Sequence, residues 1–176
     1  SATFCVAVGS DANVKPQFAV GNPSNWKMKT MPKFKYVSSL RFVTCVSTTY
    51  CVAVGGAGEN DGVDDRIVLF SGDPKTWNDS KATIVQYRDV IEPSGVSCIA
   101  PKQCLITFTT MNQGSVGNFF FGDPAKLSVS SIKHFETAGS LNELRCQTKS
   151  KCIGIGLGSS GRPPKKGQPA GNYSTT

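Results

Sequence analysis

The chain has 176 residues, of which 39% are hydrophobic and 18% are charged, and its formal net charge is +7. This balance excludes a disordered polypeptide, and the length allows one domain with a sizeable core. No apolar run approaches the roughly 20 residues that a membrane-spanning helix needs, so a helical membrane protein is excluded as well.

The first unit, near residues 1–39, opens with Cys5 and a β-type run. An apolar strand then leads into a Gly-Asn-Pro turn at positions 21–23, and Trp26 stands third after the proline. These are turn residues, because an Asx side chain bonds the backbone and proline presets φ. We therefore predict a strand on each side of this turn, with Trp26 packed in the core.

The next two units, near residues 40–93 and 94–140, repeat this order behind a complete cysteine pair. In each pair five residues separate the two cysteines, and a Gly-Asp-Pro turn follows after a variable loop. The third residue after the proline is again large and apolar, Trp77 and then Leu127. The fourth unit, near residues 141–158, supplies one more cysteine pair. Residues 159–176 are rich in Gly, Pro and Ser and predict a loop or tail.

Six of the seven cysteines share this five-residue spacing, and the second cysteine recurs about every 50 residues, a period typical of repeat proteins. Cysteines that oppose each other on antiparallel strands lie within disulfide reach. Zinc is the alternative, but its sites favour closer cysteine pairs or histidine partners, and His134 is the single histidine. We expect three disulfides, with Cys5 unpaired or intermolecular; the expected pairs are Cys45–Cys51, Cys98–Cys104 and Cys146–Cys152.

Disulfides persist in oxidising compartments, so the cysteine pattern predicts an extracellular or cell-surface protein. Two N-x-S/T sequons, at Asn78 and Asn172, agree with that location and are candidate glycosylation sites.

Four short β segments in each unit of about 50 residues predict an all-β fold made of four-stranded antiparallel propeller blades. About three and a half repeats cover residues 1–158. The first unit lacks its opening strand and the last one stops early. We therefore expect an incomplete ring that the rest of a parent protein or another chain completes. The alternative is a closed four-blade ring that leaves Cys5 unpaired.

The repeated C-x₅-C-x-A-V-G pattern, followed by an apolar strand that leads to a tryptophan, resembles the repeats of secreted β-propeller proteins. Tandem arrays in actinobacterial extracellular proteins are typical of these repeats, which are distantly similar to the Asp-box repeats of sialidases. The turn at 71–77 lacks the central glycine of that box, so sialidase catalysis does not carry over. The resemblance implies a blade scaffold outside the cytosol.

Two polar groups are weak candidates for ligand binding. Four alternating lysines on an expected strand share one face and could attract acidic glycans; they are Lys27, Lys29, Lys33 and Lys35. One loop carries oxygen ligands of the kind that Ca²⁺ prefers, at Glu59, Asn60, Asp61, Asp64 and Asp65. A solvated edge strand and a solvated loop are the alternatives, and calcium is the single cofactor considered. Nucleic acid is not expected as a partner.

Catalysis has little support in the sequence. A Ser-His-Asp or Cys-His assembly would depend entirely on His134, in an expected strand. Carboxylates that a glycosidase would need could be nominated at Glu92, Glu136 and Glu143, but they recur near the unit boundaries, which favours a scaffold role.

The sequence thus predicts a non-enzymatic extracellular module for binding or assembly, with a protein or glycan ligand or with its own copies in a filament or coat. The alternative is a propeller-type carbohydrate-active enzyme, glycosidase- or sialidase-like, whose site lies partly outside this chain.

Overall fold

The computed structural model describes residues 4–31, 33–58, 65–87, 91–110, 116–135 and 138–158. The fold is all-β and consists of four antiparallel sheets, with short 3₁₀ turns between strands. Among these residues, the structure contains no helix with the length and apolar character required to span a bilayer.

Sheets 1 and 2 follow the chain without crossovers. Sheet 1 has the order β1-β2-β3 and sheet 2 the order β4-β5-β6-β7. The strands are β1 (Cys5–Ser10), β2 (Pro16–Gly21), β3 (Lys29–Thr30), β4 (Val37–Ser47), β5 (Tyr50–Gly58), β6 (Arg66–Gly72) and β7 (Thr83–Gln86).

Sheets 3 and 4 continue the same meander. Sheet 3 has four strands, whereas sheet 4 has two strands in the part of the chain that the structure describes. The strands are β8 (Ile91–Ala100), β9 (Gln103–Thr110), β10 (Val116–Gly122), β11 (Lys133–His134), β12 (Ala138–Thr148) and β13 (Lys151–Gly158).

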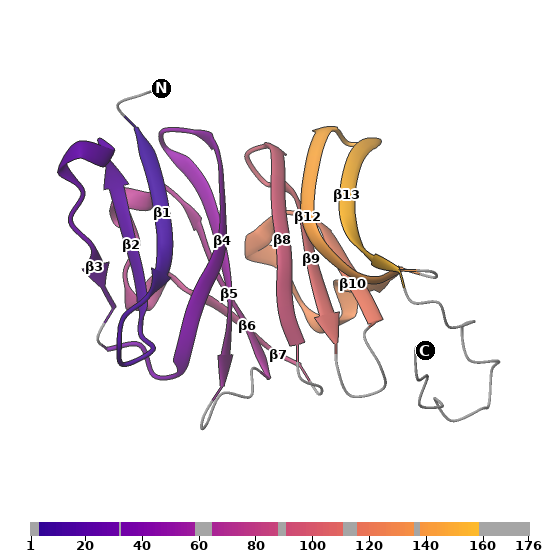
Figure 1. Ribbon diagram of the computed structural model, residues 1–176, viewed down its shortest axis with the longest axis horizontal. Coiled ribbons are helices and arrows are strands. Elements are labelled where there is room, and N and C mark those ends of the chain that lie inside the picture. Colours follow the sequence, from indigo (N-terminus) through magenta and orange to yellow (C-terminus); the bar gives the residue numbers. More distant parts are fainter. Residues whose placement is uncertain are drawn as a thin grey trace.

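The four sheets are arranged one after another in chain order (Figure 1). The contacts run from β1 to β4, from β4 to β8 and from β8 to β12. Two apolar cores fill the spaces on either side of sheet 2. Val52 and Val54 lie in the core shared with sheet 3, whereas Cys51 and Ala53 lie in the core shared with sheet 1. Because side chains alternate along a strand, the apolar run of β5 buries both faces of its sheet.

Strand pairing shows that the units are structurally equivalent. Cys5 pairs with Gly21, Cys51 with Gly72 and Cys104 with Gly122, so β1 occupies the place of β5 and β9 in its sheet. Each of the three glycines has a positive φ, between 102° and 154°. A glycine is needed there because L-residues are disfavoured in that conformation.

The Gly-Asx-Pro turns adopt the predicted chemistry. Each Asx residue caps a 3₁₀ turn, η1 (Pro23–Asn25), η2 (Pro74–Thr76) or η4 (Pro124–Lys126), and accepts a hydrogen bond from a backbone N–H two residues later. Trp77 and Leu127 are buried, with 1% and 5% of their surface exposed, which confirms core packing for both. Trp26 is only half-buried, and its Nε1–H donates to the carbonyl of Gly21 at 3.1 Å.

The three expected disulfides are confirmed. Each closes the hairpin between the first and second strands of its sheet, with Cα atoms 4.0 Å apart. The bonded pairs are Cys45–Cys51, Cys98–Cys104 and Cys146–Cys152. Cys5 is a free thiol, half-buried on β1.

The first strands begin earlier than the motif predicts. β4, β8 and β12 start at residues 37, 91 and 138, each before a register shift in its pairing with the next strand. Arg41 lies within the shift in β4, and Ser94 and Asn142 occupy the equivalent places. Such a bulge bends a strand and breaks its alternation, so the sequence pattern shows only the part after the bulge.

Candidate functional site

A shallow hollow lies along the first strands of sheets 2, 3 and 4. Its volume is about 170 Å³, and each strand contributes the three residues directly before its first cysteine. They are Phe42, Val43, Thr44, Gly95, Val96, Ser97, Glu143, Leu144 and Arg145. The same repeat positions thus line one continuous groove.

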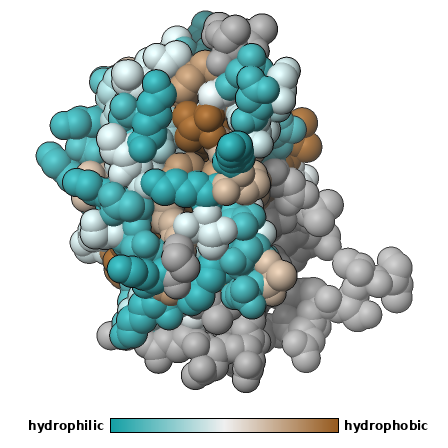
Figure 2. Space-filling view, turned by 90° about the vertical axis from the view of Figure 1, so that its left-hand side faces the viewer, coloured by the Kyte–Doolittle hydropathy of each residue, from teal (hydrophilic) through white to brown (hydrophobic). Residues whose placement is uncertain are grey.

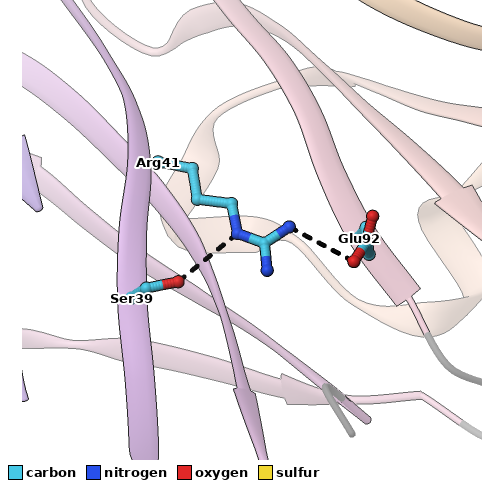
Figure 3. A network of polar contacts seen from close by, with 3 residues as sticks. All are labelled: Ser39, Arg41 and Glu92. Carbon is cyan, nitrogen blue, oxygen red and sulfur yellow. Dashed lines mark hydrogen bonds and ion pairs between the residues drawn. The ribbon is translucent and has the colours of Figure 1, made fainter. Parts of the chain in front are cut away.

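Polar contacts connect the strands beside this groove. The guanidinium of Arg41 on β4 lies 3.4 Å from the Glu92 carboxylate on β8, and its Nε–H donates to Ser39 Oγ at 3.3 Å (Figure 3). Both side chains of the ion pair are partly exposed, so the pair is worth at most about 1 kcal/mol. On sheet 4, Glu143 and Arg145 approach to 3.8 Å. The nominated Glu92 and Glu143 therefore each have an arginine partner; Glu136 lies outside the described residues.

Two apolar side chains are exposed on the outer face of sheet 4, opposite Arg145 and Glu143 on β12. Ile153 and Ile155 on β13 expose 72% and 66% of their surface. Their equivalents in sheet 2, counted from the second cysteine, are Val52 and Val54, which are completely buried against sheet 3. The face that binds the next sheet inside the stack is thus uncovered at sheet 4, among the described residues.

Sheet 3 has a second exposed apolar area, beside sheet 4. Phe120 on β10 belongs to the core shared with sheet 2, so Phe119 and Phe121 point to the opposite face. Phe119 is half-buried and stacks on Phe135 with ring centroids 4.6 Å apart, while Phe121 is 41% exposed.

Sheet 1, at the other end of the stack, presents a different surface. Figure 2 shows a face that is hydrophilic over most of its area, with a small apolar patch in its upper half. In sheet 2, β5 pairs with β4 on one side and with β6 on the other. The equivalent strand of sheet 1, β1, pairs with β2 alone within the described residues. Cys5 lies on this edge strand, at the place where Cys51 bonds Cys45 in sheet 2.

Tyr50 connects the hairpin tips of sheets 2 and 3. Its phenolic oxygen accepts a hydrogen bond from the backbone N–H of Lys102 at 3.1 Å. Burial raises the pKa of Tyr50 above its ordinary value, the hydrogen bond from Lys102 opposes this shift, and the charge of Asp123 adds to it.

The prediction that four lysines share one strand face is wrong. Of the four, only Lys29 lies in a strand, the two-residue β3, because the chain has a turn at residue 33 and bends at residues 35 and 36. The Lys29 ammonium donates to the carbonyl of Trp77 at 3.3 Å, and that of Lys35 lies 5.3 Å from the centre of the Tyr36 ring. Lys27 and Lys33 are exposed, and binding of polyanions stays a prediction.

The calcium candidates lie mostly outside the described residues, namely Glu59, Asn60, Asp61 and Asp64. Asp65 is described, and its carboxylate forms an ion pair with the buried Arg66. In the described ranges, no three His, Cys, Asp or Glu side chains gather as a metal site.

The remaining candidates have local structural roles. Asn78 is exposed and caps the turn η3 (Asp79–Lys81) by accepting from Ser80 N–H at 3.0 Å; its glycosylation stays a prediction. Asn172 is outside the described residues. His134 lies on β11, as predicted, and its Nδ1 is hydrogen-bonded to the buried Asn118.

Sequence reasoning did not identify the exposed apolar residues Phe121, Ile153 and Ile155 as candidates. The signal was present in the repeat, because alternate residues after each second cysteine face the following sheet. No family model, curated protein or solved structure matches this chain.

Proposed function

We propose that the chain is a non-enzymatic, disulfide-stapled module of propeller type that acts outside the cytosol by binding other β-sheet chains, further copies of itself included. One observation carries the proposal: Ile153 and Ile155 are exposed at positions where Val52 and Val54 are buried between sheets. Apolar side chains that are exposed at positions buried against a neighbouring sheet elsewhere in the chain support an interaction surface there.

The stacking of the sheets supports the propeller interpretation. Successive sheets contact each other through β1 and β4, β4 and β8, and β8 and β12, as neighbouring blades of a propeller do. In this proposal the four sheets are part of a propeller ring, which another chain or the rest of a parent protein completes. The three disulfides are consistent with an extracellular location.

The charges at sheet 4 define the partner further. Arg145 lies opposite Ile153 and Glu143 opposite Ile155, and Lys149 and Lys151 are exposed at the β12–β13 hairpin, so basic residues outnumber acidic ones here. A partner with an apolar centre and acidic residues at its rim would be complementary to this end of the stack.

Self-association tests this binding face directly. Because sheets 1 and 4 both carry basic residues, sedimentation should be measured at an ionic strength of about 1 M, where the Debye length is only about 3 Å. We expect the chain to associate with rising concentration, and the double variant Ile153→Ser/Ile155→Ser to remain monomeric. Ile84→Ser, at a 40% exposed position on β7, is the matched control and should associate like the parent chain.

A parent chain that stays monomeric throughout, or a double variant that associates equally well, would contradict the proposal. A discrete stoichiometry would indicate ring closure, and an open series of polymers would indicate a filament or coat.

A further inference from the structure

We infer that the edge of β13 that no described strand covers, together with Phe119 and Phe121 on β10, forms a docking site for one extended segment of another polypeptide. The segment would add a strand to sheet 4 and place a large apolar side chain over Phe119. This inference rests on the proposed binding role and specifies the chemistry of the partner.

The internal repeats show what this site accepts. In sheets 2 and 3, the strand next to the second cysteine strand is β6 or β10, paired so that a glycine opposes the cysteine. In the described part of sheet 4, β13 pairs with β12 alone. A strand added to β13 in the same register would place a glycine opposite Cys152.

The position of Phe119 is equivalent to two occupied positions. Phe18 pairs with Val8, Leu69 with Val54 and Phe119 with Thr107, which is the same place in each sheet. Phe18 and Leu69 are 3% and 1% exposed, because the following sheet covers them. Phe119 is less buried, and the adjacent Phe121 is largely open.

The residue that covers the occupied positions comes from the Gly-Asx-Pro turn of the following sheet. Trp77 packs edge-on against Phe18 with ring centroids 5.6 Å apart, and Leu127 shares a core with Leu69. Trp77 and Leu127 each stand five residues after the strand-ending glycine. The partner segment is therefore an apolar strand followed by Gly-Asx-Pro-x-x and a tryptophan or leucine.

Strand addition is a recognised mode of peptide binding, in which the backbone edge supplies affinity and side-chain pockets supply specificity. Here the edge of β13 would supply the hydrogen bonds, and Phe119 and Phe121 would supply an apolar contact surface. The interface continues the one already present between sheets 1 and 2 and between sheets 2 and 3.

The test uses the whole disulfide-bonded chain and a synthetic peptide with the sequence of residues 16–27, which contains the strand, the Gly-Asn-Pro turn and Trp26. Its affinity is measured by fluorescence anisotropy of a dye-labelled peptide. We expect saturable binding, at least tenfold weaker for a peptide with Trp26→Ser and absent for a scrambled peptide.

Variants of the chain locate the site. Phe121→Ser should weaken binding at least tenfold, because Phe121 borders the site and its exposure allows the variant to fold. Ile84→Ser has a nearly equal exposure on another sheet, and should bind like the parent chain. Hydrogen exchange should show new protection of β13 amides when the peptide is bound.

Binding that is unaffected by Phe121→Ser, or binding without new protection of β13, would overturn the inference. Either result would leave the proposed function standing, provided that Ile153→Ser/Ile155→Ser still abolishes self-association. If instead the peptide binds as expected but Ile153→Ser/Ile155→Ser does not abolish self-association, the proposed function is contradicted.

Discussion

Sheets 1 and 2 are built from equivalent strands, but within the described residues β5 pairs with β4 on its disulfide-bonded side, whereas the equivalent β1 has no such partner. Gly9 on β1 and Gly55 on β5 each stand four residues after the equivalent cysteine. A Cβ at Gly9 would meet nothing within 4 Å, whereas a Cβ at Gly55 would lie 1.9 Å from the Ser39 carbonyl oxygen on β4. The same residue type is thus required sterically in one sheet and not in the other.

The opposite end of the stack shows the same contrast in apolar packing. Val54 is completely buried between sheets 2 and 3, whereas the equivalent Ile155 of sheet 4 is 66% exposed. The local sequences are similar, so the neighbours of each sheet determine what its residues contribute to stability. The two end sheets therefore carry the surfaces available for binding.

The largest expected effect is at Gly55. Gly55→Ala should lower the free energy of unfolding by about 3 kcal/mol or more, because the backbone of β4 would have to move. Gly9→Ala is the matched control, and we expect a change within about 0.5 kcal/mol. Urea denaturation of both variants measures the difference, and equal destabilisation would show that β1 is also covered.

Truncation of the equivalent apolar residues should give the next largest difference. Val54→Ala should cost about 2 kcal/mol through lost burial and an unfilled cavity. Ile155→Ala should change stability by no more than about 0.5 kcal/mol, because Ile155 is mostly exposed. Thermal unfolding at low protein concentration, where self-association is weak, is the measurement. A large loss of stability in Ile155→Ala would show that Ile155 is buried in a core and would contradict its assigned exposure.

The disulfides should differ in their rates of reduction. Cys45 is exposed but its partner Cys51 is completely buried, as is Cys104; in the Cys146–Cys152 bond neither residue is buried and Cys152 is exposed, so a thiol reagent reaches that bond most readily. Brief treatment with dithiothreitol, followed by alkylation and peptide mass spectrometry, should detect labelled Cys146 and Cys152 first. Earlier labelling of Cys98 and Cys104 would contradict the assigned exposure.

The smallest expected effect concerns Tyr50 at high pH. Its pKa is raised in the folded chain, so the unfolded chain releases this proton first and gains stability above pH ~10. The free energy of unfolding should therefore fall with rising pH, and less steeply in Tyr50→Phe. Urea denaturation from pH 8 upward measures the two slopes, and identical slopes would exclude a contribution from Tyr50.

Much of this fold could be predicted because its signals are local. The cysteine spacing fixed the hairpins of sheets 2, 3 and 4, and the Gly-Asx-Pro turns marked the strand ends at Gly21, Gly72 and Gly122. The bulge at Arg41 was missed, since a register shift removes the alternation from which a strand is recognised. The lysines between residues 27 and 35 led to a wrong strand prediction, because they alternate in the sequence although the backbone turns or bends at residues 33 and 35.

The candidate binding surface was harder to predict than the fold. Ile153 and Val52 have the same local pattern, and only the packing of the following sheet distinguishes an exposed residue from a buried one. Trp26, expected in the core, is likewise half-buried because the side of sheet 1 away from sheet 2 is uncovered by the described residues.

Hydrogen exchange of the unliganded chain, at a concentration where it is monomeric, tests the open ends most directly. The inner strands β5 and β9 are paired on both sides, whereas β1 and β13 are each paired on one side within the described residues. We predict slow exchange throughout β5 and β9, and fast exchange at alternate amides of β1 and β13, where the N–H groups point away from a paired strand. Uniformly slow exchange in β1 and β13 would show that these edges are covered and would contradict this prediction.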